Sequence, residues 1–304
     1  MDLKVRTNRD RIVTISVQGE VSAPVMRTSY RVGYDGVARV SPATGGIVYN
    51  VRVGDTVYGW AGDHVEPGVS SKDKDEAVNT AYNTLACVGN RAVVVSGEAK
   101  GSSGVVTGKH GGIEHVIIDF APSILEKLAI GDKILVRAAG QGLEITDFPE
   151  VKVMNLDPDL FERMDIEVTG AAAGRGRKAK LSVPVVAEVP AVLMGSGLGA
   201  STAHSGDYDI TTQDPPVLVK LGLDKLRFGD LVAIRDASSF YGRSYRRGAV
   251  IIGVIIHSDS KIAGHGPGVT TLLTANHGEI EPRLDPKANV AVLLGLRPES
   301  EFPA

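Results

Sequence analysis

The histidines of this chain lie beside glycine and acidic residues, in short segments where the strand-like pattern of apolar residues breaks down. All seven fall in such windows, at residues 63–66, 109–115, 203–209, 256–259, 264–268 and 276–278. Histidine is the most common metal ligand and titrates near neutral pH, and a neighbouring carboxylate can fix its ring orientation. Any single histidine is more simply explained as a surface turn residue. Because three windows combine histidine with carboxylates, the pattern predicts a metal or acid–base site on glycine-rich loops.

The window at 194–210 has the most specific spacing. Asp207 and Asp209 would project to one face of an extended segment, and His204 would join them through a bend at 205–206. The alternative is that the two aspartates only shape a turn. We expect a divalent ion (zinc, manganese or calcium) and no nucleotide cofactor. The predicted metal ligands are His64, His204, Asp207, Asp209 and His265, and the predicted catalytic residues are His204, Asp207 and His110.

The first half of the same window is a glycine-rich run that can expose successive backbone N–H groups to an oxyanion or another anion. The residues predicted to bind substrate or oxyanion are Gly195, Ser196, Gly197, Gly199 and Arg243. No Gly-Lys-Ser/Thr follows the run, and no helix is expected directly after it. The run is therefore not a nucleotide-binding loop.

The elements that must position these windows are mostly short strands. Runs of β-branched residues bounded by Gly, Pro or Asp predict strands at 11–19, 91–97, 115–120, 133–137, 183–189, 231–235 and 249–257. A helix is expected only at 73–88, with short helical turns at 122–128 and at 158–164, where Asp157 would cap the first turn. With 36 Gly, 15 Pro and 5% aromatic residues, the composition favours a mainly β fold, a β-rich α+β chain with few short helices.

An internal repeat divides this β structure in two. Residues 125–132 and 223–230 both read Leu, acid, Lys, Leu, any residue, apolar, Gly, Asp, and each is followed by a strand ending in Arg; a weaker copy lies at 53–55. Gly-Asp turns also recur by chance, because Gly takes positive φ and Asp bonds to its own turn. We favour two related small β-barrel or sandwich modules. The first covers 1–150, the second 180–304, and 151–179 forms a linker or crossover.

Charge and cysteine content restrict the function classes. The formal net charge is −3, so the basic face of a nucleic-acid binder is not expected. The single cysteine, Cys87, excludes an internal disulfide and multi-cysteine metal sites, and it is more simply a buried thiol than a nucleophile. No apolar stretch approaches the roughly 20 residues of a membrane span. We expect a cytoplasmic protein that binds a small molecule, contacts neither nucleic acid nor membrane, and forms a homo-oligomer.

Several motifs resemble those of a known bacterial family. The motifs are HVEPGVS (64–70), CVGN (87–90), VVSG (94–97), GKHGG (108–112), GQG (140–142), GDYDI (206–210) and AGHGPGVTT (263–271). Together they resemble domain of unknown function 4438 over nearly the whole chain, from about residue 5 to 295. Residues 91–112 also resemble a KOW hairpin, at their glycine and valine positions only, which indicates a tight SH3-like hairpin. The family resemblance implies no settled activity.

A fainter resemblance is to the acetamidase/formamidase enzymes, which are β-rich metal-dependent amide hydrolases. Their pattern His-Gly-Gly-Asn-x-Asp-Ile is similar to residues 204–210, with Ser205 replacing the first Gly and Asp207 replacing Asn. Their downstream acidic motifs are not matched, since the corresponding strand ends in Arg235-Asp236. The same ligand set and reaction therefore do not follow from this resemblance.

Three functions remain open at this point. The first is a metal-dependent hydrolase of a small amide or related polar metabolite, in which the ion lowers the pKa of a bound water to about 7. The second is a non-catalytic carboxylate-binding protein that uses Arg243, Arg246 and Arg247 as clamps. The third is a structural, oligomeric β-protein. Convergence of at least three of the candidate ligands would separate the first from the other two.

Overall fold

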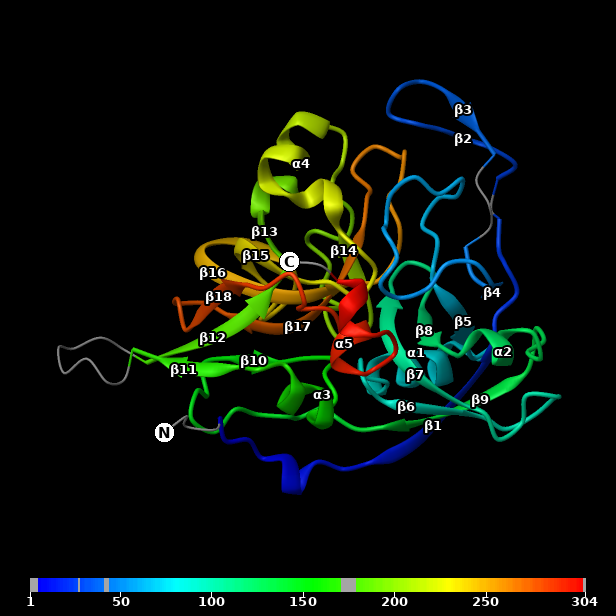
Figure 1. The fold of residues 1–304 in the computed structure, drawn as a ribbon, viewed down its shortest axis with the longest axis horizontal. Coiled ribbons are helices and arrows are strands. Elements are labelled where there is room, and N and C mark those ends of the chain that lie inside the picture. The colour runs from blue at the N-terminus through cyan, green and yellow to red at the C-terminus, as the bar shows by residue number, and fades with distance from the viewer. Residues whose placement is uncertain (1–4, 27, 41–43, 171–178, 303–304) are drawn as a thin grey trace.

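The computed structural model describes residues 5–26, 28–40, 44–170 and 179–302. The chain is β-rich with few, mostly short helices, as the sequence predicts (Figure 1). The helices are α1 (Glu76–Leu85), α2 (Pro122–Leu125), α3 (Pro158–Arg163), α4 (Pro215–Leu221) and α5 (Val290–Leu293). The strands in the first half are β1 (Ile15–Val21), β2 (Arg31–Val32), β3 (Ala38–Arg39), β4 (Ile47–Val48), β5 (Gly68–Lys72), β6 (Arg91–Val94), β7 (Ser103–His110), β8 (His115–Asp119) and β9 (Lys133–Ala138). Those in the second half are β10 (Lys152–Val153), β11 (Glu167–Thr169), β12 (Lys180–Val185), β13 (Ala187–Pro190), β14 (Asp207–Asp209), β15 (Leu231–Ser238), β16 (Ser244–Ile255), β17 (Gly268–Ala275) and β18 (Ile280–Leu284).

The N-terminal half closes into a six-stranded antiparallel barrel. Its strands run in the order β1-β9-β6-β7-β8-β5, and β5 pairs back to β1, with β4 added beside β5. The expected hairpin at 91–110 forms between β6 and β7. Valine, isoleucine and alanine side chains of these strands fill the barrel, and Tyr82 of α1 packs on the same cluster. The Asp75 side chain caps α1 by accepting a hydrogen bond from the Val78 N–H, so this helix begins near the expected place.

The C-terminal half is built on a sheet in the order β10-β17-β16-β15-β13. Strand β14 pairs with the first three residues of β17, 268–270. Residues 249–255 of β16 and all of β17 are buried, because other elements cover both faces of the sheet there. A three-stranded sheet, β11-β12-β18, lies beside it. Residues 151–170 of the expected crossover form β10, α3 and β11, and the first and last of these pair with β17 and β12. The rest of that crossover, 171–178, lies outside the described residues.

The repeated Gly-Asp turns share one local geometry. At 54–55, 131–132 and 229–230 the glycine has φ of +97°, +90° and +87°. Each aspartate carboxylate accepts a hydrogen bond of 2.7–2.9 Å from the backbone N–H three residues earlier. The strands that follow differ in their partners: β9 has two antiparallel neighbours, whereas β15 has parallel β13 on one side. The relation between the two halves is therefore seen in these turns, whereas the strands that follow them pair differently.

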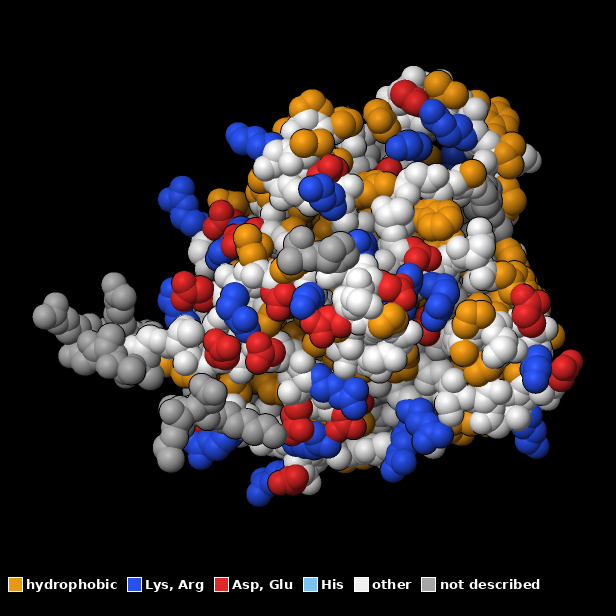
Figure 2. Space-filling view, viewed as in Figure 1, with side chains coloured by type: hydrophobic (Ala, Val, Ile, Leu, Met, Phe, Trp, Pro, Cys, Tyr) orange, Lys and Arg blue, Asp and Glu red, His pale blue; other side chains and the backbone are white. Residues whose placement is uncertain are grey.

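Other features agree with their sequence signals. Asp157 caps α3, and α2 begins at Pro122. Cys87 is buried and unpaired, and burial raises the pKa of its thiol to about 11, which suits a core residue better than a nucleophile. Among the described residues no helix is long and apolar enough to cross a membrane. Figure 2 shows charged side chains scattered over one face, with hydrophobic side chains along the outer edge of the β2–β3 arm.

Candidate metal centre

A cavity of about 580 Å³ opens between the barrel and the C-terminal sheet. The barrel side contributes His64 and the β7–β8 turn, which begins at His110. The opposite side contributes Asp207 and Asp209 of β14 and the loop before β17, which carries His265. Four of the five residues predicted as metal ligands therefore border one cavity. The strand-end loops of two different sheets meet there, which is where β-rich folds collect functional side chains.

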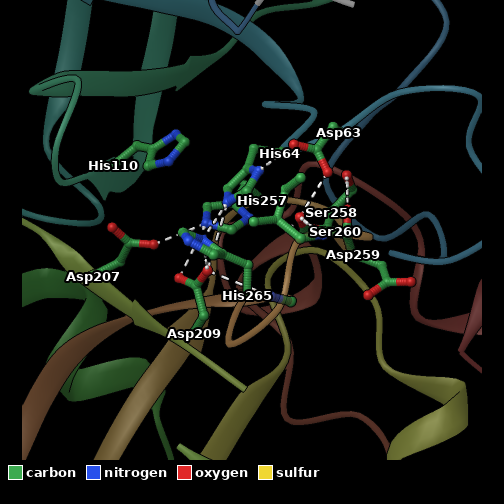
Figure 3. A network of polar contacts seen from close by, with 12 residues as sticks. Asp63, His64, His110, Asp207, Asp209, His257, Ser258, Asp259, Ser260 and His265 are labelled. Carbon is green, nitrogen blue, oxygen red and sulfur yellow. Dashed lines mark hydrogen bonds and ion pairs between the residues drawn. The ribbon is translucent and has the colours of Figure 1, made fainter. Parts of the chain in front are cut away.

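The histidine rings form a compact group at the floor of this cavity (Figure 3). The His64 ring lies 5.7 Å from His110, 4.7 Å from His257 and 5.0 Å from His265, measured between ring centroids. The centroids of His110 and His257 are 4.4 Å apart. His64 has a φ of +54°, a conformation that non-glycine residues rarely adopt. Such a conformation persists where the surrounding structure enforces it, and it is common at functional sites.

Two carboxylates of β14 face the histidines. Asp207 and Asp209 lie on the same side of the strand, as the two-residue spacing predicts, because β14 is held in antiparallel register with β17. Asp209 directs Oδ2 at Nδ1 of His265, 3.0 Å away, and at Nε2 of His64, 3.5 Å away. Its Oδ1 lies 3.6 Å from Nε2 of His257. Asp209 therefore lies between three histidines, in the position of a shared or bridging ligand.

The other ring nitrogen of three histidines has a fixed partner. Nδ1 of His64 lies 2.9 Å from Asp63 Oδ2, and Nδ1 of His257 donates to the Ser258 carbonyl at 2.9 Å. Nδ1 of His110 bonds to Glu66. Glu66 is buried and also contacts Nδ1 of His115 and the Ser70 hydroxyl. With Nδ1 engaged in this way, Nε2 of His110 and of His257 is left as a lone-pair donor, which is the usual arrangement around a bound metal. Nε2 of His64 lies 3.0 Å from Nδ1 of His265, so these two nitrogens face each other within the cluster.

Two atoms at the centre of the cluster lack a hydrogen-bond partner among the described residues. Nε2 of His257 and Oδ2 of Asp207 are only 2.9 Å apart, yet both are buried without a properly directed hydrogen bond. Unpaired buried polar atoms are costly, and a cation coordinated by both would satisfy them.

Three overlapping triads offer donor atoms within 4.8 Å of one another: His64–His110–His257, His64–Asp209–His265 and Asp207–Asp209–His257. The donor set of imidazole and carboxylate fits a divalent ion such as zinc or manganese.

The electrostatics of the cluster agree with this donor set. Burial alone would raise the pKa of Asp209, but the close contacts with His257, His265 and His64 hold it well below its usual value. Burial alone would lower the pKa of His257, but Asp207 and Asp209 raise it well above its usual value. The two carboxylates therefore stay ionised, and their charge favours the protonated form of the neighbouring His257.

His204, which was predicted both as a ligand and as a catalytic residue, is not in any of the triads. Its carbonyl oxygen accepts a hydrogen bond from the buried Lys109 ammonium at 2.9 Å, and this contact anchors the bend that was expected to swing its ring toward Asp207. Its Nδ1 is buried without a hydrogen-bond partner in the described part of the chain. The predicted ligands that converge therefore do not include His204, whose backbone carbonyl is bound by Lys109.

The glycine-rich run also differs from its prediction. Ser196 and Gly197 line the cavity, as expected. The N–H groups of Gly195, Ser196, Leu198 and Gly199 nevertheless donate to backbone carbonyls of the protein, so they are not free to bind an oxyanion. Within the described residues only the Gly197 N–H of this run has no such partner. The run fixes the loop around it, while Arg243, the remaining residue of the predicted set, lines the cavity.

Two residues of the site were not among those predicted from the sequence. His257 lies two residues after β16, and its window, His257-Ser-Asp259, contains the same combination of histidine and carboxylate as the others. Glu66 belongs to the His64 window and holds His110 in place. For both His257 and Glu66, the feature of the sequence that could have identified them is a polar residue next to a predicted histidine or at the end of a buried strand.

Comparison with known proteins places the chain in a family. Residues 30–162 match the model of the DUF4438 N-terminal domain, and residues 172–294 match that of the DUF4438 C-terminal domain. The chain belongs to the DUF4438 family. A solved structure described as the crystal structure of TM1086 is 50% identical to this DUF4438 protein, covering 95% of this chain and 99% of that one with a TM-score of 0.88. No curated protein matches, and neither the family models nor this structure extends the likeness to acetamidase/formamidase enzymes.

Proposed function

We propose that this DUF4438 protein is a metal-dependent hydrolase of a small amide or related polar metabolite. The observation that carries the proposal is that four histidines and two aspartates from both halves of the chain form three overlapping triads. Within each triad the donor atoms lie within 4.8 Å of one another. Purely structural ions are usually enclosed by protein ligands, whereas five of these six donors, all except His257, border a cavity of about 580 Å³. That size suits a small molecule, and it leaves room for water or substrate next to the ion.

A divalent ion in such a site supplies a water of pKa near 7 and polarises a carbonyl group. The chain's own residues set the geometry for this chemistry. Asp63, Glu66 and the Ser258 carbonyl orient the histidine rings, and Asp209 joins the two sides of the cluster. His265, with 29% of its side chain exposed, is the most open of the donors. It is therefore the donor best placed to exchange a proton with substrate, or to be displaced from the ion by substrate.

Elemental analysis of the purified protein tests the metal centre. After dialysis against zinc, manganese or calcium and then buffer, we expect one or two equivalents of one of these ions per chain. Asp209→Asn removes the shared carboxylate, so its affinity for the ion should fall by at least about 100-fold, at the upper end of what loss of a supporting residue costs. Asp224→Asn, an exposed carboxylate outside the cavity, is the matched control and should keep full loading. Less than a tenth of an equivalent of every ion in the wild type would refute the proposal.

Catalysis needs a separate test. The loaded protein should hydrolyse at least one member of a panel of small amides, imides and ureas, and chelation should abolish that activity. A non-catalytic binding protein is the second candidate, since Arg243 lines the same cavity. Metal-dependent binding of panel members without turnover would favour the second candidate.

A further inference from the structure

We propose that the substrate of the metal centre is a small carboxylic acid, and that Arg243 binds its carboxylate while the hydrolysed group reaches the ion. This inference rests on the proposed metal-dependent function. Arg243 directly precedes β16 and lines the same cavity as Asp207, Asp209 and His265. Only 3% of its surface is exposed, so it is a buried cation at the wall of the site.

The Arg243 guanidinium lacks the partners that a buried charge requires. Its Nε and Nη2 are buried and make no hydrogen bond among the described residues. Arginine remains protonated in proteins, and an unpaired buried charge is strongly unfavourable. Other arginines of the chain have carboxylate partners, such as Arg235 with Glu188 and Arg297 with Asp55. The missing partner of Arg243 is therefore expected to come from the ligand.

The nearby aspartates do not fill this role. Asp207 accepts a hydrogen bond from the Gly111 N–H at 2.7 Å with Oδ1 and turns Oδ2 toward His257. Asp209 turns both of its oxygens toward histidines. Both carboxylates act on Arg243 through their charge but not through a hydrogen bond. Arg243 is therefore an unpaired cation, while Asp207 and Asp209 beside it already have other partners. A ligand with one negative charge would supply the partner that Arg243 lacks.

Arg243 is held rigidly enough to act as a positioning group. Its backbone N–H donates to the Ala200 carbonyl, and its carbonyl accepts from the Gly199 N–H, both at 2.9 Å. Its guanidinium lies 5.3 Å from the centre of the Tyr208 ring, within range of a cation–π contact. This gives the glycine-rich run a function different from the one expected from its sequence: it fixes the arginine that binds the anion. Preorganisation of this kind lowers the entropic cost of binding.

The substrate class follows from these two fixed points. One end of the molecule carries a carboxylate for Arg243, and the other carries a hydrolysable carbonyl for the ion. A cavity of about 580 Å³ limits the molecule to a small metabolite, such as an N-acylated amino acid or the monoamide of a dicarboxylic acid. Arginine recognises planar carboxylates through paired N–H groups, so lysine replaces it poorly.

Calorimetry with metal-binding probes tests the inference. The probes are the monohydroxamates of malonic, succinic and glutaric acid, each compared with an alkyl hydroxamate in which methyl replaces the carboxylate. For at least one length, the carboxylate probe should bind the metal-loaded wild type about tenfold more tightly than its alkyl counterpart, as one charge-assisted bidentate contact allows. Arg243→Met should abolish this preference and leave the alkyl hydroxamate unaffected, and Arg243→Lys should retain only part of it.

The controls separate the inference from the proposal on which it rests. Arg137→Met, at an exposed position of β9 outside the cavity, should keep the full preference. Equal affinity for carboxylate and alkyl probes at all three lengths in the wild type would overturn the inference, as would a preference that survives in Arg243→Met. If the alkyl hydroxamates bind equally with and without metal, the metal centre itself is refuted instead. Because Arg243→Lys keeps the charge, it preserves the test if Arg243→Met does not fold.

Discussion

At the scale of single residues, the site depends on which nitrogen of each histidine is left free. Three rings have Nδ1 bonded to a carboxylate or a carbonyl, so Nε2 points to the centre of the cluster. The space at that centre also depends on a glycine. A Cβ on Gly268 would lie 2.0 Å from Oδ2 of Asp207 and 2.3 Å from Nε2 of His257. Any side chain at this position of β17 would push the two unpaired donors apart.

Gly268→Ala should therefore weaken metal binding by at least about tenfold, because the added methyl displaces two donor groups at once. Titration of the apo-protein with zinc or manganese measures the effect. Gly253→Ala on neighbouring β16 is the matched control, since its Cβ would meet Val269 at 2.3 Å, away from the donors. That variant should lose stability but keep its metal affinity. Unchanged affinity in Gly268→Ala would show that Asp207 and His257 do not share an ion.

The residues of the site could be read from the sequence in part. His64, Asp207, Asp209 and His265 were predicted because their windows combine histidine, acid and glycine, and all four line the cavity. His204 was predicted on the same ground but belongs to none of the triads, and its backbone carbonyl is bound by Lys109, which is distant in sequence. The free or bonded state of the N–H groups at 195–199 likewise depends on partners far along the chain. Residue type and spacing therefore identified the candidate donors, whereas contacts between distant parts of the chain determine which of them meet.

At the scale of elements, the Gly-Asp turns were predictable and the sheets around them were not. A turn is closed by bonds between residues three apart, so its sequence is sufficient to define it. Strand partners are chosen by pairing over long separations, and the same kind of turn launches β9 between two antiparallel strands and β15 beside a parallel one. The presence of a small barrel could therefore be predicted from the number and length of the expected strands. The pairing of β5 with β1 that closes the barrel could not.

Asp230 is the turn residue whose loss should cost most. It is 2% exposed, and it accepts hydrogen bonds from the Arg227 N–H at 2.7 Å and from Asn289 Nδ2 at 2.8 Å. Asp230→Ala leaves both buried donors unpaired, so the free energy of unfolding should fall by about 2 kcal/mol in urea denaturation. The exposed Asp224→Ala should change it by less than about 0.5 kcal/mol. A loss no greater than that of the control would mean that the repeated turn does not stabilise the fold.

The pH dependence of the same variant has a defined sign. Burial raises the pKa of Asp230 to about 7, well above the usual aspartate value of about 3.9. The native state therefore holds this proton more tightly than the unfolded state, and the contribution of Asp230 to stability declines as pH rises from 4 to 7. The difference between wild type and Asp230→Ala should accordingly be larger at pH 5 than at pH 8. A larger difference at pH 8 would contradict the raised pKa.

At the scale of the whole molecule, the site lies where the two halves meet. His64 and His110 come from the N-terminal half, and Asp207, Asp209, His257 and His265 come from the C-terminal half. The halves also approach closely there, since a Cβ on Gly206 would lie 3.0 Å from the Cα of Gly111. An ion held by both halves therefore acts as a link between them. The homo-oligomer expected from the sequence stays a prediction, which light scattering would test.

Metal removal should therefore destabilise both halves together. A ligand present at 100 times its dissociation constant stabilises the native state by about 2.7 kcal/mol, which corresponds to roughly 4 °C in Tm for a chain of this size. Calorimetry of the loaded protein should show one transition that moves down by about that amount after chelation. Asp209→Asn should melt at the same temperature with and without the ion, because it has lost the carboxylate that joins the donors of the two halves. Two separate transitions, of which only one responds to the ion, would mean that the donors of a single half bind it and that the junction is not the site.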